Sequence, residues 1–221
     1  MKIPFMKNKN FIILALAPVV LLSAGCDWRG IRGNGKIKTE TRPVSDFTRL
    51  DAGGFYNIQW KPGAPSLSVT TDENLLSHIE TRVDGSTLRI DTRDQIYTHN
   101  GIKIAITSPS LRGADLSGAL KLEAAQLSGD RFALETSGAS KVTLSGSITR
   151  LLASLTGASR LNAESLQAQD VEIAVTGAGR ADIFASNSVK AAITGAGKVN
   201  YAGNPKEVQK KVTGAGKISP R

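Results

Sequence analysis

Six basic side chains occupy the same place in a short phrase that this chain repeats, and their type and spacing point to the binding of anions. The phrase reads hydroxyl, Gly, Ala, small residue, base, and successive phrase glycines lie 20, 19, 20, 18 and 19 residues apart. If the repeats stack in register about 4.8 Å apart, the bases form a positive stripe about 24 Å long. Such a stripe could contact phosphate or uronate groups along a polymer. The six bases are Lys121, Lys141, Arg160, Arg180, Lys198 and Lys217.

The alternative role for these bases is solubility, in which acidic residues separate them and they only keep an outer corner solvated. The phrase glycines do not predict a nucleotide site. Gly177-x-Gly179 and its two successors are followed by no helix signature, which a phosphate-binding loop requires. The Gly-Gly-x-Gly-x-Asp pattern of calcium-binding repeats occurs in no coil.

Catalytic and metal chemistry find little support in the sequence. His78 and His99 have no Cys or His at metal-ligand spacing, so we expect both to be structural or at the surface. The acidic residues after Leu111 do not recur at one position of the repeat, whereas β-helical enzymes that cleave acidic polysaccharides cluster such residues on one strand face. We expect no catalytic residue, no metal and no cofactor.

The repeat itself predicts the fold that must position these residues. A period of 19–20 residues is typical of stacked coils rather than of a mixed globular fold. Apolar residues one, three and five positions before the hydroxyl, as in Leu155, Ala153 and Leu151, share one face of a strand. We predict an all-β chain, folded as a right-handed parallel β-helix (β-solenoid) with about 19–20 residues per coil and repeat coils from about residue 111.

Each residue of the phrase has an expected role at a corner of the coil. Gly allows a positive φ or a close backbone approach. Ala is expected to fill a corner too tight for a larger side chain. The Ser or Thr hydroxyl is expected to bond to the backbone or to stack as a ladder, and the base is expected to point outward.

Residues 36–110 carry strand signals without the repeat. Asp84-Gly85 is typical of a tight hairpin. Residues 72–79 predict one helical turn, which Asp72 can cap. The sequence leaves open whether this region forms coils of the same solenoid or a separate cap.

The first 25 residues predict export. A basic start is followed by an apolar run from Phe11 to Leu22, too short to span a bilayer but typical of a signal peptide. Small residues then precede Cys26, which resembles a bacterial lipoprotein signal, although Ser23 stands where that signal usually has an aliphatic residue. Cys26 is the only cysteine, so it has no internal disulfide partner. We expect it to be lipidated.

We therefore divide the chain into a lipoprotein signal peptide (residues 1–25), a tether (26–35) and a β-helical domain (36–221). The lipid is expected to hold the exported protein at a membrane of the bacterial envelope, facing the periplasm or the cell surface. Asp27 resembles an inner-membrane retention signal, but that rule differs between bacterial groups, and the leaflet stays open.

The charge of the chain is moderately basic. Its formal net charge is +9, and Lys2, Lys7 and Lys9 of the leader account for three, which leaves +6 for the rest. This excess favours anionic partners. Nucleic acid is not expected as a partner, because the protein is expected to be exported. An aromatic content of 5% also leaves few rings for base stacking.

Several motifs in a fixed order resemble a known family over about residues 33–217: the putative auto-transporter adhesin, head GIN domain family. The resemblance implies an exported bacterial protein, often a lipoprotein, with a β-helical fold. It implies no catalytic residue, and the family's function is not established. The motifs are Gly33-x-Gly35, Arg42-x-Val44-x-x-Phe47, Gly54-x-Tyr56-Asn57-Ile58, Asp72-Glu73-Asn74-Leu75, Asp84-Gly85-x-x-Leu88-x-Ile90 and the repeated phrases.

These observations favour a lipid-anchored, non-enzymatic β-helical protein that binds a partner, either an anionic glycan or another envelope protein. One alternative is a structural module whose open solenoid end pairs with a second copy, because an uncovered strand edge invites pairing. A polysaccharide-degrading enzyme is the least favoured alternative.

Overall fold

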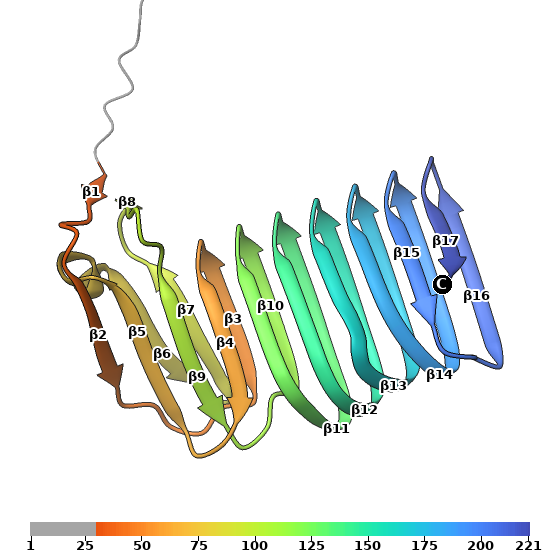
Figure 1. The fold of residues 1–221 in the computed structure, drawn as a ribbon, viewed down its shortest axis with the longest axis horizontal. Helices are drawn as coiled ribbons and strands as arrows, with labels where there is room; N and C mark the ends of the chain where they lie inside the picture. Colours follow the sequence, from red (N-terminus) through yellow and green to blue (C-terminus); the bar gives the residue numbers. More distant parts are fainter. Residues whose placement is uncertain (1–29) are drawn as a thin grey trace, which may run out of the picture.

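The solenoid is built from long parallel strands that stack along one axis (Figure 1). The computed structural model describes residues 30–221, which form a nearly all-β solenoid of about five turns. The predicted all-β solenoid is therefore confirmed. The expected signal peptide and Cys26 lie outside the described residues.

Each repeat coil contributes strands that run down one face, bend, and return up the other to a phrase glycine. Neighbouring coils pair in parallel with their phrases in register, as in Gly138 with Gly157 and Gly177 with Gly195. The coils are thus 18–20 residues long, as the repeat predicts. Their strands are β10 (Gly113–Gly118), β11 (Lys121–Gly138), β12 (Lys141–Gly157), β13 (Arg160–Gly177), β14 (Arg180–Gly195), β15 (Lys198–Ala202), β16 (Glu207–Thr213) and β17 (Lys217–Pro220).

A thin apolar core fills each coil because alternate side chains point inward. Leu151, Ala153 and Leu155 are buried. They pair with Val171, Ile173 and Val175 of the next coil, which are buried as well. Each inward side chain therefore packs against its equivalents in the coils on either side.

Part of the region 36–110 extends the same solenoid. β3 (Arg49–Gly54) pairs in parallel with β10, and β4 (Asn57–Pro62) with β11. β7 (Thr87–Thr92) and β9 (Lys103–Ser108) then pair in parallel with β3 and β4. The layers therefore do not follow chain order, because residues 49–62 lie between residues 87–108 and the repeat coils (Figure 1).

The rest of this region closes the N-terminal end with antiparallel strands. β5 (Ser66–Asp72) pairs with β9, β2 (Ile37–Arg42) with β5, and β6 (Ile79–Asp84) with β7. The β6–β7 turn confirms the hairpin predicted at Asp84-Gly85. Two short strands, β1 (Ile31–Arg32) and β8 (Ile96–Tyr97), pair in parallel. The segment expected to be a tether therefore includes a strand.

The predicted helical turn is the 3₁₀ helix η1 (Glu73–His78), with Leu75 and Leu76 buried. The expected cap at Asp72 is wrong. Its side chain makes no capping hydrogen bond and instead accepts hydrogen bonds from residues far away in the chain.

The C-terminal end of the stack has no cap among the described residues. Val208 and Val212 continue the buried column of Val189 and Ile193, but they are 36% and 42% exposed. Between them, Lys210 takes the inward position that Ala191 holds one coil earlier. Its ammonium lies 4.9 Å from the ring centroid of Tyr201. A lysine at an edge strand is a common device against strand pairing.

The phrase glycine sets the spacing between coils at one corner. The φ angles of the six phrase glycines are all positive and lie between 96° at Gly157 and 116° at Gly195. A Cβ added at Gly195 would lie 2.6 Å from the carbonyl oxygen of Gly177. That oxygen accepts a hydrogen bond from the amide of Ala196 at 2.9 Å. Glycine is therefore needed here for both backbone conformation and space.

We predict that Gly195→Ala lowers the free energy of unfolding by about 1–3 kcal/mol more than Gly129→Ala, measured by urea denaturation. The two glycines share a φ of 116°, but an added Cβ at Gly129 meets nothing within 4 Å. The comparison therefore separates the clash between coils from the strain of positive φ. Equal losses would refute the argument that the close approach requires glycine.

Candidate functional site

The six phrase bases lie in one column along the glycine corner. Each pairs with its equivalent in the next coil, from Lys121 with Lys141 to Lys198 with Lys217. The register extends beyond the repeat to Asn57 and then to Lys103. We refer to the six bases Lys121, Lys141, Arg160, Arg180, Lys198 and Lys217 as the basic stripe.

The basic stripe is solvent-accessible and its charges are not neutralised. Five of its side chains are exposed and Lys198 is half-buried. Within residues 30–221, none of the six side chains makes an ion pair or a hydrogen bond. The outward column two residues further on holds acids at only two of its six positions. It consists of Glu123, Thr143, Asn162, Asp182, Asn200 and Ser219.

One of these two acids accepts a hydrogen bond within its own column. Asp182 accepts a hydrogen bond at 2.6 Å from the side-chain amide of Asn200, and Asn200 in turn accepts one from Ser219 at 3.2 Å. Most of the stripe therefore faces neutral polar neighbours. Separation of the bases by acids, which the solubility role assumed, does not describe this surface.

The remaining phrase residues differ from expectation at two positions. The Ala side chains are exposed at the corner, so the prediction that they fill a tight space is wrong. The next residue points inward instead, and its size falls along the stack from Leu120 through Ser140 to Gly179. Ser140 donates a hydrogen bond to the carbonyl oxygen of Gly118 at 3.3 Å.

The phrase hydroxyls stack as one exposed ladder on the other side of the glycines. Thr156, Thr176 and Thr194 pair in register. None of them makes a side-chain hydrogen bond within the described range. Of the two roles expected for the hydroxyl, the ladder is therefore the one observed. The corner thus presents hydroxyls, small side chains and bases in three parallel columns.

A groove of about 680 Å³ adjoins the corner at its N-terminal end. Phe55 takes the place that Ala119 has one coil later, and it is 39% exposed. Its ring stacks on that of Tyr56, with centroids 6.3 Å apart. The groove combines Phe55, Ile96 and Tyr97 with the polar side chains of Asp91, Gln95 and His99.

Sequence analysis missed this groove because its wall is the loop between β7 and β9, residues 93–102, which has no motif. The one usable signal is Phe55, a ring at a corner that is otherwise Ala. Aromatic rings and polar groups in a groove of this size are typical of small-molecule sites.

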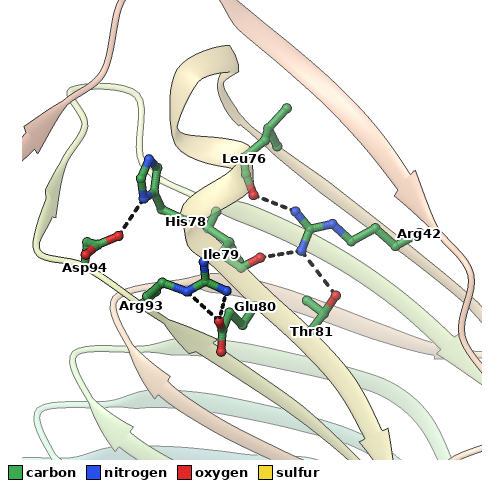
Figure 2. Close-up of polar contacts among 8 residues, drawn as sticks. All are labelled: Arg42, Leu76, His78, Ile79, Glu80, Thr81, Arg93 and Asp94. Carbon is green, nitrogen blue, oxygen red and sulfur yellow. Dashed lines mark hydrogen bonds and ion pairs between the residues drawn. The ribbon is translucent and has the colours of Figure 1, made fainter.

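Polar contacts join the loop at residues 93–102, which we call the groove loop, to η1 and β6 at the N-terminal end of the solenoid (Figure 2). Arg93 contacts the carboxylate of Glu80 through Nε at 2.8 Å and Nη2 at 2.5 Å. Nδ1 of His78 lies 2.7 Å from Oδ2 of Asp94. His78 thus has a structural contact, as expected for this residue, while His99 lines the groove and is exposed.

Arg42 ties β2 to the end of η1 from the other side (Figure 2). Its guanidinium donates hydrogen bonds to the carbonyl oxygens of Leu76 at 2.7 Å and Ile79 at 2.6 Å. It also contacts the hydroxyl of Thr81 at 3.2 Å. The carbonyl oxygen of Leu76 also accepts the backbone N–H of Ile79, so Arg42 adds a second donor there and links β2 to both η1 and β6.

Asp72 links the N-terminal segment to the groove loop. Its buried carboxylate accepts hydrogen bonds from the hydroxyl of Thr98 at 2.5 Å and from the amide of Gly35 at 2.7 Å. The hydrogen bond from Thr98, followed by that from Gly35, lowers the pKa of Asp72 below its ordinary value of 3.8.

Three carboxylates share one column, and two of them, Asp115 and Glu135, belong to the acids after Leu111 that were expected not to recur at one position. Asp51, Asp115 and Glu135 pair in register in successive layers. Asp51 lies 3.3 Å from Arg89, and Asp115 lies 2.8 Å from Arg49. Two of the three are therefore held in ion pairs.

Over residues 30–221, no group of three His, Cys, Asp or Glu side chains is placed to hold a metal ion. No helix of the same range is long and apolar enough to cross a membrane.

The family model described as "Putative auto-transporter adhesin, head GIN domain" matches residues 46–205, and the chain belongs to this family. The match begins near β3 and ends after β15, so it includes most of the groove lining, five of the six phrase glycines and five of the six stripe bases. Among curated proteins, no relative matches the chain.

Three solved structures of Bacteroides and Parabacteroides proteins share the fold. A putative adhesin from Bacteroides fragilis is 24% identical, with a TM-score of 0.74, over 87% of this chain and 100% of that one. A putative lipid binding protein from Parabacteroides distasonis is 22% identical, with a TM-score of 0.57, over the same shares. A putative adhesin from Parabacteroides merdae is 20% identical, with a TM-score of 0.56, over 87% and 99%.

We predict that Asp72→Asn destabilises the protein at neutral pH but not in acid. Because folding lowers the pKa of Asp72, its carboxylate contributes stability above pH 3.8, and this contribution is lost as the pH falls through the lower folded pKa. The difference in unfolding free energy between wild type and Asp72→Asn should therefore shrink below about pH 4. Denaturant titrations between pH 7 and pH 2 measure it.

Thr98→Val serves as the matched variant, because it removes the strongest hydrogen bond to the carboxylate and keeps the charge. Its own stability should depend less on pH in the acid range than that of wild type. A wild-type to Asp72→Asn difference that stays constant from pH 7 to pH 2 would contradict the assignment.

Proposed function

We propose that this protein is a lipid-anchored, non-enzymatic module of the bacterial envelope that holds an anionic polysaccharide along its glycine corner. The observation that carries the proposal is the basic stripe: six bases in register whose side chains make no ion pair or hydrogen bond within the described range. Equally spaced charges suit a polymer with an acidic group on successive sugars.

The neighbouring columns support a polysaccharide rather than isolated anions. Because the exposed Ala side chains beside the stripe are small, they do not obstruct an extended polysaccharide chain that lies along it. The hydroxyls of Thr156, Thr176 and Thr194 can donate to and accept from sugar hydroxyls. At the N-terminal end, the exposed ring of Phe55 offers an apolar face for a sugar ring.

The family and the solved structures support an adhesion-like binding role. The family is described as an adhesin head domain, and two of the three structures are named as adhesins. An adhesin-like family also suggests an exported envelope protein. One structure is named as lipid binding, and the part-apolar groove at Phe55 is the place where this chain could hold an acyl group.

The two alternatives have weaker support. Exposed Val208 and Val212 would favour pairing through the C-terminal end, but Lys210 and Lys211 on the same edge strand would meet like charges in a second copy. For an enzyme, the nearest feature is the carboxylate column, where Arg49 and Arg89 hold two of the three acids in ion pairs.

We predict that replacing Lys141, Arg160 and Arg180 together by Gln reduces binding of polygalacturonate by about tenfold or more, since three of the six contacting charges are lost. Binding of wild type should also weaken as salt rises, because exposed charges are screened. Affinity electrophoresis or calorimetry at two salt concentrations measures both effects.

The matched control replaces Lys190, Lys206 and Lys211 by Gln, which removes the same charge outside the stripe. We expect this control to bind polygalacturonate nearly as wild type does. Similar weakening in both triple variants would mean that only net charge matters and would refute the stripe as a site.

The lipid anchor gives a separate prediction, which concerns residues outside the described range. Cys26→Ala removes the thiol that would be acylated, and the protein should then leave the membrane fraction and become soluble. Cell fractionation with metabolic labelling by a fatty acid measures this. Continued membrane partition of Cys26→Ala without label would rule out lipidation at Cys26.

A further inference from the structure

A second polar cavity, of about 560 Å³, lies where the N-terminal layers meet the first repeat coil. It is lined by the start of β3, by the connection between β9 and β10, and by the bend of β11. β3 runs from this edge to Gly54, and the second half of β11 runs from the bend to Gly138, which is in register with Gly54 through Gly118. Figure 1 shows these strands crossing the solenoid from one edge to the other. The cavity therefore lies at the edge of the solenoid opposite the basic stripe.

The cavity exists because the strand ladder is interrupted at this point. β11 pairs with β4 over Lys121–Ala124 and with β10 over residues 133–138. Residues 125–132 have no strand partner on this side, since residues 109–112 cross from β9 to β10 here. Backbone groups of this bend are therefore available to a ligand, as they are in many anion sites.

Arginine side chains give the cavity its charge. The side chains of Arg112 and Arg131 are exposed, and neither guanidinium makes an ion pair or a hydrogen bond within residues 30–221. Arg49 pairs with Asp115 at 2.8 Å and lies over Gly113, where an added Cβ would be 3.1 Å from its Nη1. Arg131 is also in register with Arg150 of the next coil. Neighbouring like charges at strand spacing repel each other, which an anion would relieve.

Hydroxyl groups complete the lining, and one acid opposes the arginines. Thr48, Ser110 and Ser128 line the cavity, and their side chains make no hydrogen bond within the described range. Asp130 is the carboxylate of the lining and is exposed. Two free guanidinium groups thus face one carboxylate, while the charge of Arg49 is balanced by Asp115.

We propose that this cavity binds the phosphate or sulfate ester of a sugar. Guanidinium groups bind tetrahedral oxyanions through two parallel hydrogen bonds, and free hydroxyls can donate to the remaining oxygens. The volume exceeds that of a bare oxyanion and lies in the range of small-molecule sites, so the attached sugar fits as well. The site does not depend on the proposed stripe, because it lies at the opposite edge.

Calorimetry on the full chain in detergent, at constant ionic strength, tests the proposal. The probes are glucose 6-phosphate, glucose 6-sulfate, glucose and glucuronate. At least one ester should bind, glucose should not, and the Arg112→Gln/Arg131→Gln variant should lose about tenfold or more in affinity for that ester. The ester that binds more tightly shows whether the site is suited to a sugar phosphate or to a sugar sulfate.

Two controls keep the outcome decisive. The variant with Lys141, Arg160 and Arg180 replaced by Gln should bind the ester as wild type does, which separates this site from the stripe. Both replaced arginines are exposed, so the double variant should keep the wild-type unfolding midpoint. No binding of either ester at millimolar concentration, tighter binding of glucuronate, or unchanged affinity in the double variant would each overturn the proposal.

Discussion

The close backbone approach at the glycine corner is the constraint on which the rest of this structure depends. The amide that follows each of the first five phrase glycines donates to the glycine carbonyl of the preceding layer, at 2.8–2.9 Å from Ala119 to Ala196. This bond leaves no room for a Cβ at Gly177 or Gly195, and the backbone there has a positive φ. Because every coil meets its neighbour in this way, the corner sets one register for both strands that leave it.

That register converts a local sequence pattern into a surface. Residues about twenty positions apart in the chain become neighbours at strand spacing, so one base per phrase becomes a continuous column of charge. The same register places the hydroxyls of Thr156 and Thr176 side by side and stacks the inward Leu120, Ser140 and Gly179 in order of decreasing size. The proposed polymer site is therefore a direct product of the repeat.

The groove beside Phe55 and the arginine cavity arise where the regular stacking of coils is interrupted. The loop at residues 93–102 replaces a tight corner, and its departure from the stack opens the groove beside Phe55. The crossing at residues 109–112 leaves the bend of β11 without a strand partner and opens the arginine cavity. In both places the regular stacking of strands stops, and a concave surface lined by side chains takes its place. The solenoid thus supplies a long repetitive surface and, near its N-terminal end, two concave ones.

The sequence by itself determined the solenoid, the coil length and the alignment of the six bases, because a period of 19–20 residues with alternating apolar positions admits one regular stacking. It predicted the roles of Ala and Asp72 wrongly, since both depend on which side chain faces the interior and which distant donor lies within reach. Only the tertiary structure decided that residues 49–62 lie between later segments, that antiparallel strands close the N-terminal end, and that Arg112 and Arg131 line one cavity. The pairing of strands outside the repeat depends on packing and on long-range hydrogen bonds. No local sequence pattern predicts that pairing.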